Sequence, residues 1–186
     1  MRAAIFLDRD GVLNQCEVRN GKPYAPRRLE DFHLFPDVAP SVERLRQAGY
    51  LLVVATNQPD IGNGLVSRDM VDAFHAELSG KLGLTEITLC PHRQDEGCDC
   101  RKPKPGMLVE AARRLDIELS ASYMVGDRAG DVAAGKAAGC RTIFIDRAYE
   151  AEPRPVDPDV IALSLAEAVD VILTQTDNRT GNRHGH

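Results

Sequence analysis

The chain of 186 residues contains no tryptophan, and aromatic residues make up only 5% of it. Its formal net charge is −5, and its basic residues are scattered rather than gathered into a stripe. A protein that binds nucleic acid usually presents a basic surface, and binding of single strands adds stacking aromatic side chains. The composition therefore argues against a nucleic-acid partner, including the end of a DNA strand, and favours a small-molecule substrate.

Long apolar runs are also missing from the sequence. No stretch approaches the roughly 20 apolar residues that a membrane-spanning helix needs. The first residues lack the basic region and apolar stretch of a secretion signal. We therefore expect a cytoplasmic monomer that makes no contact with a membrane.

What the sequence does contain is an alternation of apolar runs and amphipathic segments. The apolar runs predict buried strands at residues 3–7, 51–55, 86–89, 123–125 and 142–145. Helical periodicity and capping residues predict helices at 38–48, 67–82, 105–115, 130–138 and from 164 to about 173. This order is typical of an α/β fold in which a doubly wound parallel sheet is covered on both faces.

The size of the chain bounds its domain organisation. Hydrophobic residues make up 43% of the sequence, which is enough for one domain with a full core, and we expect that domain to span residues 1–175. The proline-rich stretch 152–158 predicts a surface connection. The polar stretch 176–186 predicts a disordered tail.

Polar residues follow four of the predicted strands, at the edge of a parallel sheet where ligands bind. Asp8 and Asp10 follow the first strand, Thr56 follows the second and Asp127 follows the fourth. A cluster of cysteines follows the third strand. Four strands therefore direct chemically useful side chains toward one edge.

The pair of aspartates in FLDRDGVLN, residues 6–14, does not fit a calcium-binding loop. Counting Asp8 as position 1 puts Leu13 and Arg19 at positions 6 and 12, where such a loop needs glycine and glutamate. Two carboxylates and a backbone carbonyl instead suit Mg²⁺, with Asp127 as the third residue. A carboxylate held in this way can attack phosphorus and form an aspartyl-phosphate, while a second carboxylate moves the proton.

The cysteines predict a second metal site. Three of the five, Cys90, Cys98 and Cys100, lie within eleven residues together with His92. In a cytosolic chain this clustering favours a metal over disulfides. Three thiolates and an imidazole form the tetrahedral set of structural Zn²⁺, so we expect zinc to hold the loop 90–100.

Four motifs resemble, in order, those of the haloacid dehalogenase-like phosphatases: DRDG at 8–11, VVATNQ at 53–58, the region of Lys102, and VGDRAGD at 125–131. The resemblance implies a three-layer Rossmann-like fold. It also implies that Asp8 is the nucleophile and that Asp10 is the general acid and base, which also gives its backbone oxygen to Mg²⁺. By the same resemblance, Thr56 and Lys102 contact the phosphoryl group and Asp8 and Asp127 are Mg²⁺ ligands. The role of Asp131 stays open. The short gaps between the motifs imply that the large cap domain of many relatives is missing.

DRDGVLN, TNQ and CDCRKPKPGM further resemble the D-glycero-D-manno-heptose-1,7-bisphosphate 7-phosphatases of heptose biosynthesis. This resemblance implies a phosphorylated sugar as substrate. It places substrate contacts at Asn57, Gln58, Arg101 and Arg128, and the two arginines would fit a second phosphate. The chain departs from the subfamily at TNQPDIGNG, where Asn63 replaces an arginine.

Two alternatives follow from the same residues. The spacing of the zinc loop also resembles that of the zinc-bearing histidinol-phosphate phosphatases, so histidinol phosphate is the alternative substrate. A binding module that has lost catalysis would be expected to lack an aspartate of the first or fourth motif, and both motifs are intact.

Overall fold

The structure is a computed structural model that describes the backbone of residues 1–181 and the side chains of residues 1–175. Its centre is a six-stranded sheet in the order β5-β4-β1-β6-β7-β8, and all of its neighbouring strands are parallel. The strands are β1 (Ala4–Leu7), β4 (Leu51–Asn57), β5 (Glu86–Cys90), β6 (Tyr123–Gly126), β7 (Arg141–Ile145) and β8 (Val160–Ala162).

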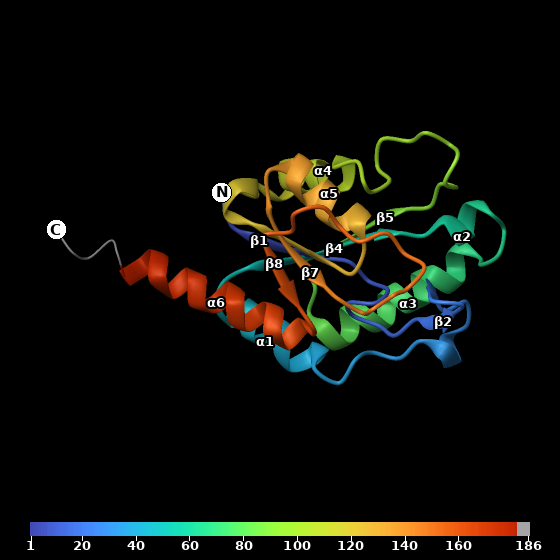
Figure 1. Cartoon of the computed structure of the whole chain (residues 1–186), viewed down its shortest axis with the longest axis horizontal. Coiled ribbons are helices and arrows are strands. Elements are labelled where there is room, and N and C mark those ends of the chain that lie inside the picture. Colours follow the sequence, from blue (N-terminus) through green and yellow to red (C-terminus); the bar gives the residue numbers. More distant parts are fainter. Residues whose placement is uncertain (182–186) are drawn as a thin grey trace.

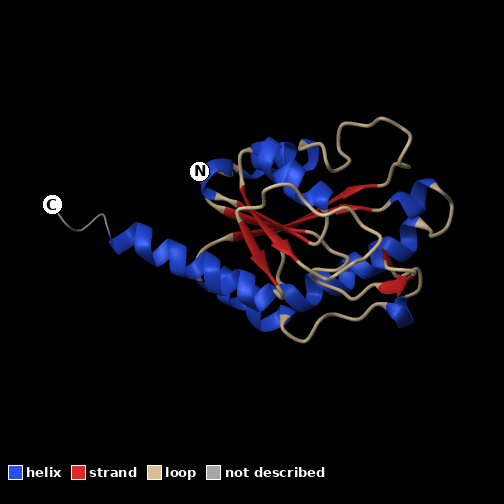
Figure 2. Cartoon of the chain, in the orientation of Figure 1, coloured by secondary structure: helices blue, strands red, loops and turns tan. Residues whose placement is uncertain are grey.

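Helices cover both faces of this sheet (Figures 1 and 2). One face carries α1 (Val38–Gln47), α3 (Arg68–Leu82) and α6 (Leu165–Gly181), and the other carries α4 (Gly106–Leu115) and α5 (Ala129–Ala138). The predicted three-layer α/β fold with a parallel sheet is confirmed.

Strand β1 shows why continuous apolar runs form the centre of the sheet. All four of its side chains are fully buried, with Ile5 and Leu7 in the hydrophobic cluster of one face and Ala4 and Phe6 in that of the other. Successive side chains of a strand point to opposite faces. A strand between two helical layers therefore needs apolar residues at every position.

The places where a cap domain could be inserted hold only small elements. After β1 the chain forms a hairpin of β2 (Glu17–Arg19) and β3 (Lys22–Tyr24), followed by the 3₁₀ turn η1 (Leu29–Asp31). After β4 it forms the short helix α2 (Pro59–Gly62) and then α3. A second 3₁₀ turn, η2 (Leu119–Ala121), precedes β6.

The sequence prediction missed the hairpin, α2 and β8, and it ended the last helix too early. Helix α6 continues to Gly181, which is beyond the predicted end near residue 173, and the disorder predicted for the tail 176–186 stays a prediction. This stretch contains no proline and no glycine before Gly181, so its polar residues do not stop the helix. Residues 182–186 of the predicted tail lie outside the described residues.

Strand β8 lies next to the stretch predicted as a surface connection. The Asp159 carboxylate accepts hydrogen bonds from the backbone N–H and the hydroxyl of Thr142, at 2.7 and 2.8 Å. These hydrogen bonds hold the chain at the edge of β7, where three residues of β8 pair with that strand.

Among the described residues, no helix is long and apolar enough to cross a membrane.

Candidate active site

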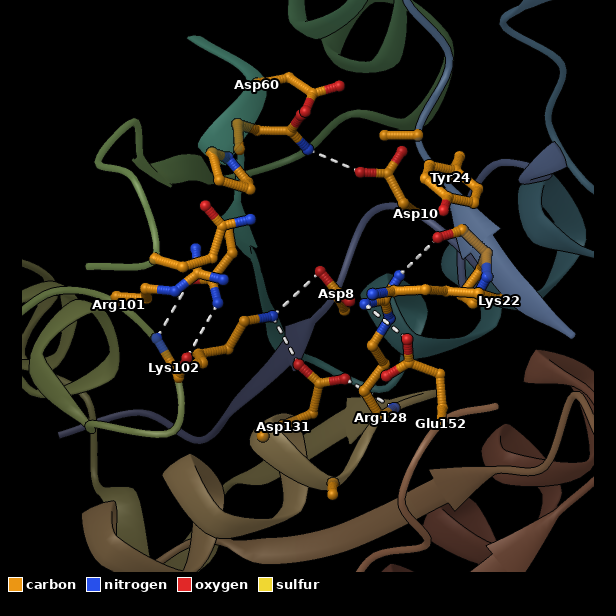
Figure 3. Close-up of a pocket in the computed structure, with 18 of the residues that line it drawn as sticks. Asp8, Asp10, Lys22, Tyr24, Asp60, Arg101, Lys102, Arg128, Asp131 and Glu152 are labelled. Carbon is orange, nitrogen blue, oxygen red and sulfur yellow. Dashed lines mark hydrogen bonds and ion pairs between the residues drawn. The ribbon is translucent and has the colours of Figure 1, made fainter. Parts of the chain in front are cut away.

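Asp8 and Lys102 form a buried ion pair at the carboxyl end of β1. The Lys102 Nζ lies 3.0 Å from Asp8 Oδ1 and 2.6 Å from Asp131 Oδ1, and it donates to the Ala55 carbonyl oxygen at 2.7 Å. Burial alone would lower the pKa of Lys102, but the charges of Asp131 and Asp8 raise it above its ordinary value. The lysine is therefore charged, and its ammonium group fixes the orientation of the Asp8 carboxylate (Figure 3).

Three buried aspartates, Asp8, Asp127 and Asp131, form an oxygen-rich cluster. One carboxylate oxygen of each lies within 4.8 Å of the others. Burial and the charge of Asp131 raise the pKa of Asp8 to about 6 against the opposing effect of Lys102. Burial, then Asp8 and Asp131, also raise the pKa of Asp127.

This cluster has the properties of a site for a hard cation. Both carboxylate oxygens of Asp127 are buried, and neither accepts a hydrogen bond that meets ordinary distance and angle limits. Burial and the other two carboxylates raise the pKa of Asp127 more than the nearby Tyr149 hydroxyl lowers it. A divalent cation would relieve the repulsion between the carboxylates, and Mg²⁺ prefers oxygen ligands. The residues present therefore fit Mg²⁺.

Gly11 allows the first and fourth motifs to come together. A Cβ atom at this position would lie 1.8 Å from Asp127 Oδ2, and the backbone has φ +84°, which favours glycine. The glycine of DRDG is therefore required by the close approach of Asp127.

The Asp10 carboxylate is held by several donors. Arg9 Nη2 donates to both of its oxygens, at 2.9 and 3.0 Å, Asn14 Nδ2 donates at 2.9 Å, and Gln58 Nε2 donates at 2.6 Å. Burial opposes ionisation, but the Arg9 charge and these hydrogen bonds together lower the pKa of Asp10 below its usual value. Asp10 is thus a carboxylate whose orientation is fixed by its donors.

Arg9 is fully buried, which sequence reasoning did not anticipate. Its guanidinium carbon lies 5.7 Å from the ring centre of Phe32 and 5.4 Å from that of Phe74, and these rings stack at 4.9 Å. Its Nη1 lies 3.2 Å from His75 Nε2. An arginine between two aspartates in a turn carries no local signal of burial, because its partners come from distant segments.

Asn57 and Gln58 of the second motif line the pocket, and their side-chain amides also hold neighbouring residues in place. Asn57 Nδ2 donates to the Lys102 carbonyl oxygen at 3.0 Å, and its Oδ1 accepts from the Lys102 N–H at 3.1 Å. Gln58 Nε2 also donates to Thr56 Oγ1 at 2.9 Å. The sequence suggests Asn57 and Gln58 as substrate contacts. Both line the pocket, and their amides also hold Lys102, Thr56 and Asp10, so the substrate contacts stay a prediction.

A pocket of about 520 Å³ opens above Asp8 and Asp10. Arg101 and Arg128 both line it (Figure 3). Arg101 Nη1 is buried and has no hydrogen-bond partner, whereas Arg128 donates to the Pro23 carbonyl oxygen at 3.2 Å and lies 3.6 Å from Glu152. Thr56 and Asp127 are buried and are not part of the lining.

The lining also includes charged residues that sequence reasoning did not single out: Lys22, Arg27, Asp60 and Glu152. Arg27 Nε donates to Asp60 Oδ2 at 2.8 Å, so an ion pair joins the segment after the hairpin to α2. Asp60 lies in the stretch TNQPDIGNG, where the sequence departs from the subfamily.

The predicted zinc ligands lie together at the end of β5. The His92 Nδ1 is 3.5 Å from Cys90 Sγ and 3.2 Å from Cys100 Sγ, and Cys98 Sγ is 3.6 Å from the sulfurs of both Cys90 and Cys100. Bonds of ~2.3 Å in a tetrahedron place sulfur ligands ~3.8 Å apart. The cluster fits a zinc ion, and it lies directly before Arg101 and Lys102 in the chain.

Comparisons with known proteins agree with this geometry. A family model described as HAD-hydrolase-like matches residues 99–168. The D-glycero-D-manno-heptose-1,7-bisphosphate 7-phosphatase of Thermosynechococcus vestitus is 41% identical, over 93% of this chain and 96% of the relative. The D-glycero-β-D-manno-heptose-1,7-bisphosphate 7-phosphatase of Pseudomonas aeruginosa is 38% identical, over 77% of this chain and 81% of the relative.

A solved structure is also similar over almost the whole chain. The crystal structure of D,D-heptose 1,7-bisphosphate phosphatase from B. bronchiseptica, complexed with magnesium and phosphate, superposes with a TM-score of 0.82. It is 31% identical, and the superposition covers 93% of this chain and 99% of that one.

Proposed function

The chain belongs to the D-glycero-D-manno-heptose-1,7-bisphosphate 7-phosphatase family of HAD-like hydrolases, and we propose that it removes the 7-phosphate of that sugar through an aspartyl-phosphate on Asp8. This proposal depends on the buried ion pair of Asp8 and Lys102, which lies at the floor of the pocket. Arg101, whose buried Nη1 has no hydrogen-bond partner, lies at the wall of the same pocket. The alternative substrate, histidinol phosphate, is not favoured, because the relatives are named for the heptose bisphosphate.

Two metal ions belong to this proposal. Asp8, Asp127 and the backbone carbonyl of Asp10 would hold Mg²⁺, which would neutralise phosphate oxygens when bound. The set Cys90, His92, Cys98 and Cys100 would hold structural Zn²⁺. The magnesium in the similar crystal structure supports the first assignment.

Asp8 is placed to act as the nucleophile. Its oxygen would form a bond to phosphorus while the bond from phosphorus to the sugar oxygen breaks, and Asp10 would give that oxygen a proton. Water would then attack phosphorus, lose a proton to Asp10 and release Asp8. Lys102, held by Asp8 and Asp131, would offset the negative charge of the transferred group.

The state of Asp10 must change during this cycle. Without substrate, the Arg9 charge and three sets of hydrogen bonds keep Asp10 ionised, with a pKa below its usual value. A dianionic phosphate beside Asp10 would raise the pKa of that carboxyl by repulsion between like charges. Binding of the substrate would therefore supply the protonated form that the leaving oxygen needs.

Arg101 is proposed to contact the second phosphate. It follows the zinc cluster directly, and its buried Nη1 has no other partner. A guanidinium group can bind phosphate through two parallel hydrogen bonds. Arg128 would contribute the N–H groups that Pro23 and Glu152 leave free.

A phosphate-release panel tests the proposed function. We expect the highest kcat/KM with a D-glycero-D-manno-heptose 1,7-bisphosphate when both anomers, hexose bisphosphates and histidinol phosphate are compared. Asp8→Asn should release phosphate at no more than background rate, because the amide is a poor nucleophile of nearly equal shape. A preference for histidinol phosphate, or turnover by the Asp8→Asn variant, would contradict the proposal.

A further inference from the structure

The hairpin β2–β3 forms one wall of the active-site pocket. Its strands are joined by Asn20 and Gly21, which have φ 49° and 72°. Two positive φ values are typical of the tight two-residue turn of a hairpin, which fixes the pairing of its strands. Lys22 and Tyr24 are two residues apart on β3, so they lie on the same side of the strand, and both line the pocket.

Contacts on either side of Lys22 anchor the hairpin in this position. The Ala151 N–H donates to the Gly21 carbonyl oxygen at 3.0 Å, and Arg128 Nη2 donates to the Pro23 carbonyl oxygen at 3.2 Å. Pro23 itself is buried. Lys22 therefore extends from a backbone that is fixed on both sides, and only its long side chain is free to move.

The charged residues of the pocket are mostly paired with one another. Lys102 lies against Asp8 and Asp131, Arg27 against Asp60, and Arg128 against Glu152. Within the described part of the chain, the side chain of Lys22 makes no ion pair or hydrogen bond. Lys22 thus supplies a positive charge that the protein itself does not neutralise.

The position of Lys22 relative to Asp8 would allow its charge to contact a bound substrate. Figure 3 shows Lys22 on the hairpin side of the pocket and Arg101 on the opposite side, with Asp8 between them. A substrate whose transferred phosphate lies at Asp8 would pass between these two cations. Two unneutralised cations above one reactive carboxylate suit a substrate with a second anionic group.

Arg19 is a cation of the same hairpin whose side-chain contacts lie within the hairpin itself. It is opposite Lys22 in the ladder, but it pairs with Glu17 at 2.9 Å and lies over the Tyr24 ring at 4.6 Å. It does not line the pocket. Both side chains are exposed, but Arg19 has partners within the hairpin, whereas Lys22 lines the pocket.

We propose that Lys22 is a specificity-determining residue, which binds the non-transferred phosphate of the substrate from the hairpin side of the pocket. This inference rests on the proposed function. The ammonium group is a compact point charge on a flexible stem, so Lys22 can reach a phosphate that enters between the two walls. Its removal should weaken the use of a bisphosphate and spare the chemistry at Asp8.

The test compares two substrates that differ only in the second phosphate, heptose 1,7-bisphosphate and heptose 7-phosphate. In Lys22→Met, kcat/KM for the bisphosphate should fall about tenfold, mainly through KM, as for a lost hydrogen bond between charged groups. The value for heptose 7-phosphate should stay within about twofold of wild type. Lys22→Arg should keep most of the selectivity, and the control Arg19→Met should leave both values unchanged.

Equal losses on both substrates in Lys22→Met, or no loss on either, would overturn the role of Lys22. A fall of the same size in Arg19→Met would also overturn it, because the effect would then belong to the charge of the hairpin as a whole. A wild-type enzyme that does not hydrolyse the bisphosphate would instead refute the proposed function. The two failures are therefore distinguishable.

Discussion

Replacement of Arg9 by methionine removes a buried positive charge and leaves the Asp10 carboxylate without its ionic partner. The side chains of this pair are 0% and 12% exposed. Methionine keeps an apolar stem against the stacked rings of Phe32 and Phe74 but cannot donate to Asp10. Breaking a buried ion pair by removal of one partner costs about 3–5 kcal/mol, so we expect Arg9→Met to lower the free energy of unfolding by that amount.

The size of this loss matters because small proteins have a total stability of only about 5–15 kcal/mol. The measurement is urea denaturation at pH 7, followed by circular dichroism, with the midpoint and slope fitted separately. The matched control is Arg68→Met, which breaks an ion pair with Asp72 on the exposed surface of α3. Because exposed helix pairs contribute only ~0.3–0.5 kcal/mol, that variant should remain close to wild type.

A double-mutant cycle distinguishes the effect of the unpaired Asp10 charge on stability from that of a simple loss of packing. In the wild-type background, Asp10→Asn should destabilise the protein because it leaves the Arg9 guanidinium buried without its partner. In the Arg9→Met background, the same change should recover at least ~1 kcal/mol because it removes the unpaired carboxylate. A loss in Arg9→Met no larger than that in Arg68→Met, or a further loss in the double variant, would refute this reasoning.

Three further predictions concern catalysis and metals. Asp10→Asn should lower kcat by ~10²–10⁴-fold, as expected for loss of general acid and base catalysis, and wild-type turnover in this variant would exclude that role. Elemental analysis of protein purified without chelator should find one zinc per chain, and removal of zinc should increase proteolysis of the loop 90–102; absence of zinc would refute the assignment. Arg101→Ala should weaken use of the heptose bisphosphate by about 1.5–3 kcal/mol more than use of an aryl phosphate, whereas an equal loss on both would place Arg101 in the general phosphoryl site.

The central strands and the motif residues could be predicted because their signals are local. Strands β1 and β4 are buried on both faces, so nearly every residue in them is apolar. Asp8 and Asp127 follow such strands directly, and the topology of a parallel sheet brings their ends together. The four proposed zinc ligands are close in sequence, and the structure brings them together in space.

The features that could not be predicted depend on distant or very short segments. Arg9 is buried in part because Phe32 and Phe74, from two other parts of the chain, pack against it. The strands of the hairpin have three residues each, too few to show a period, and their position depends on contacts with Ala151 and Arg128. The cytoplasmic location and the monomeric state stay predictions.

The most direct test of the account is to identify the residue that receives the phosphoryl group during turnover. The enzyme would be mixed with heptose 1,7-bisphosphate labelled in the 7-phosphate, quenched in acid, and analysed by peptide mass spectrometry. We expect labelled phosphate on Asp8, none in Asp8→Asn, and heptose 1-phosphate as the product. Label on another residue, or release of the 1-phosphate, would contradict it.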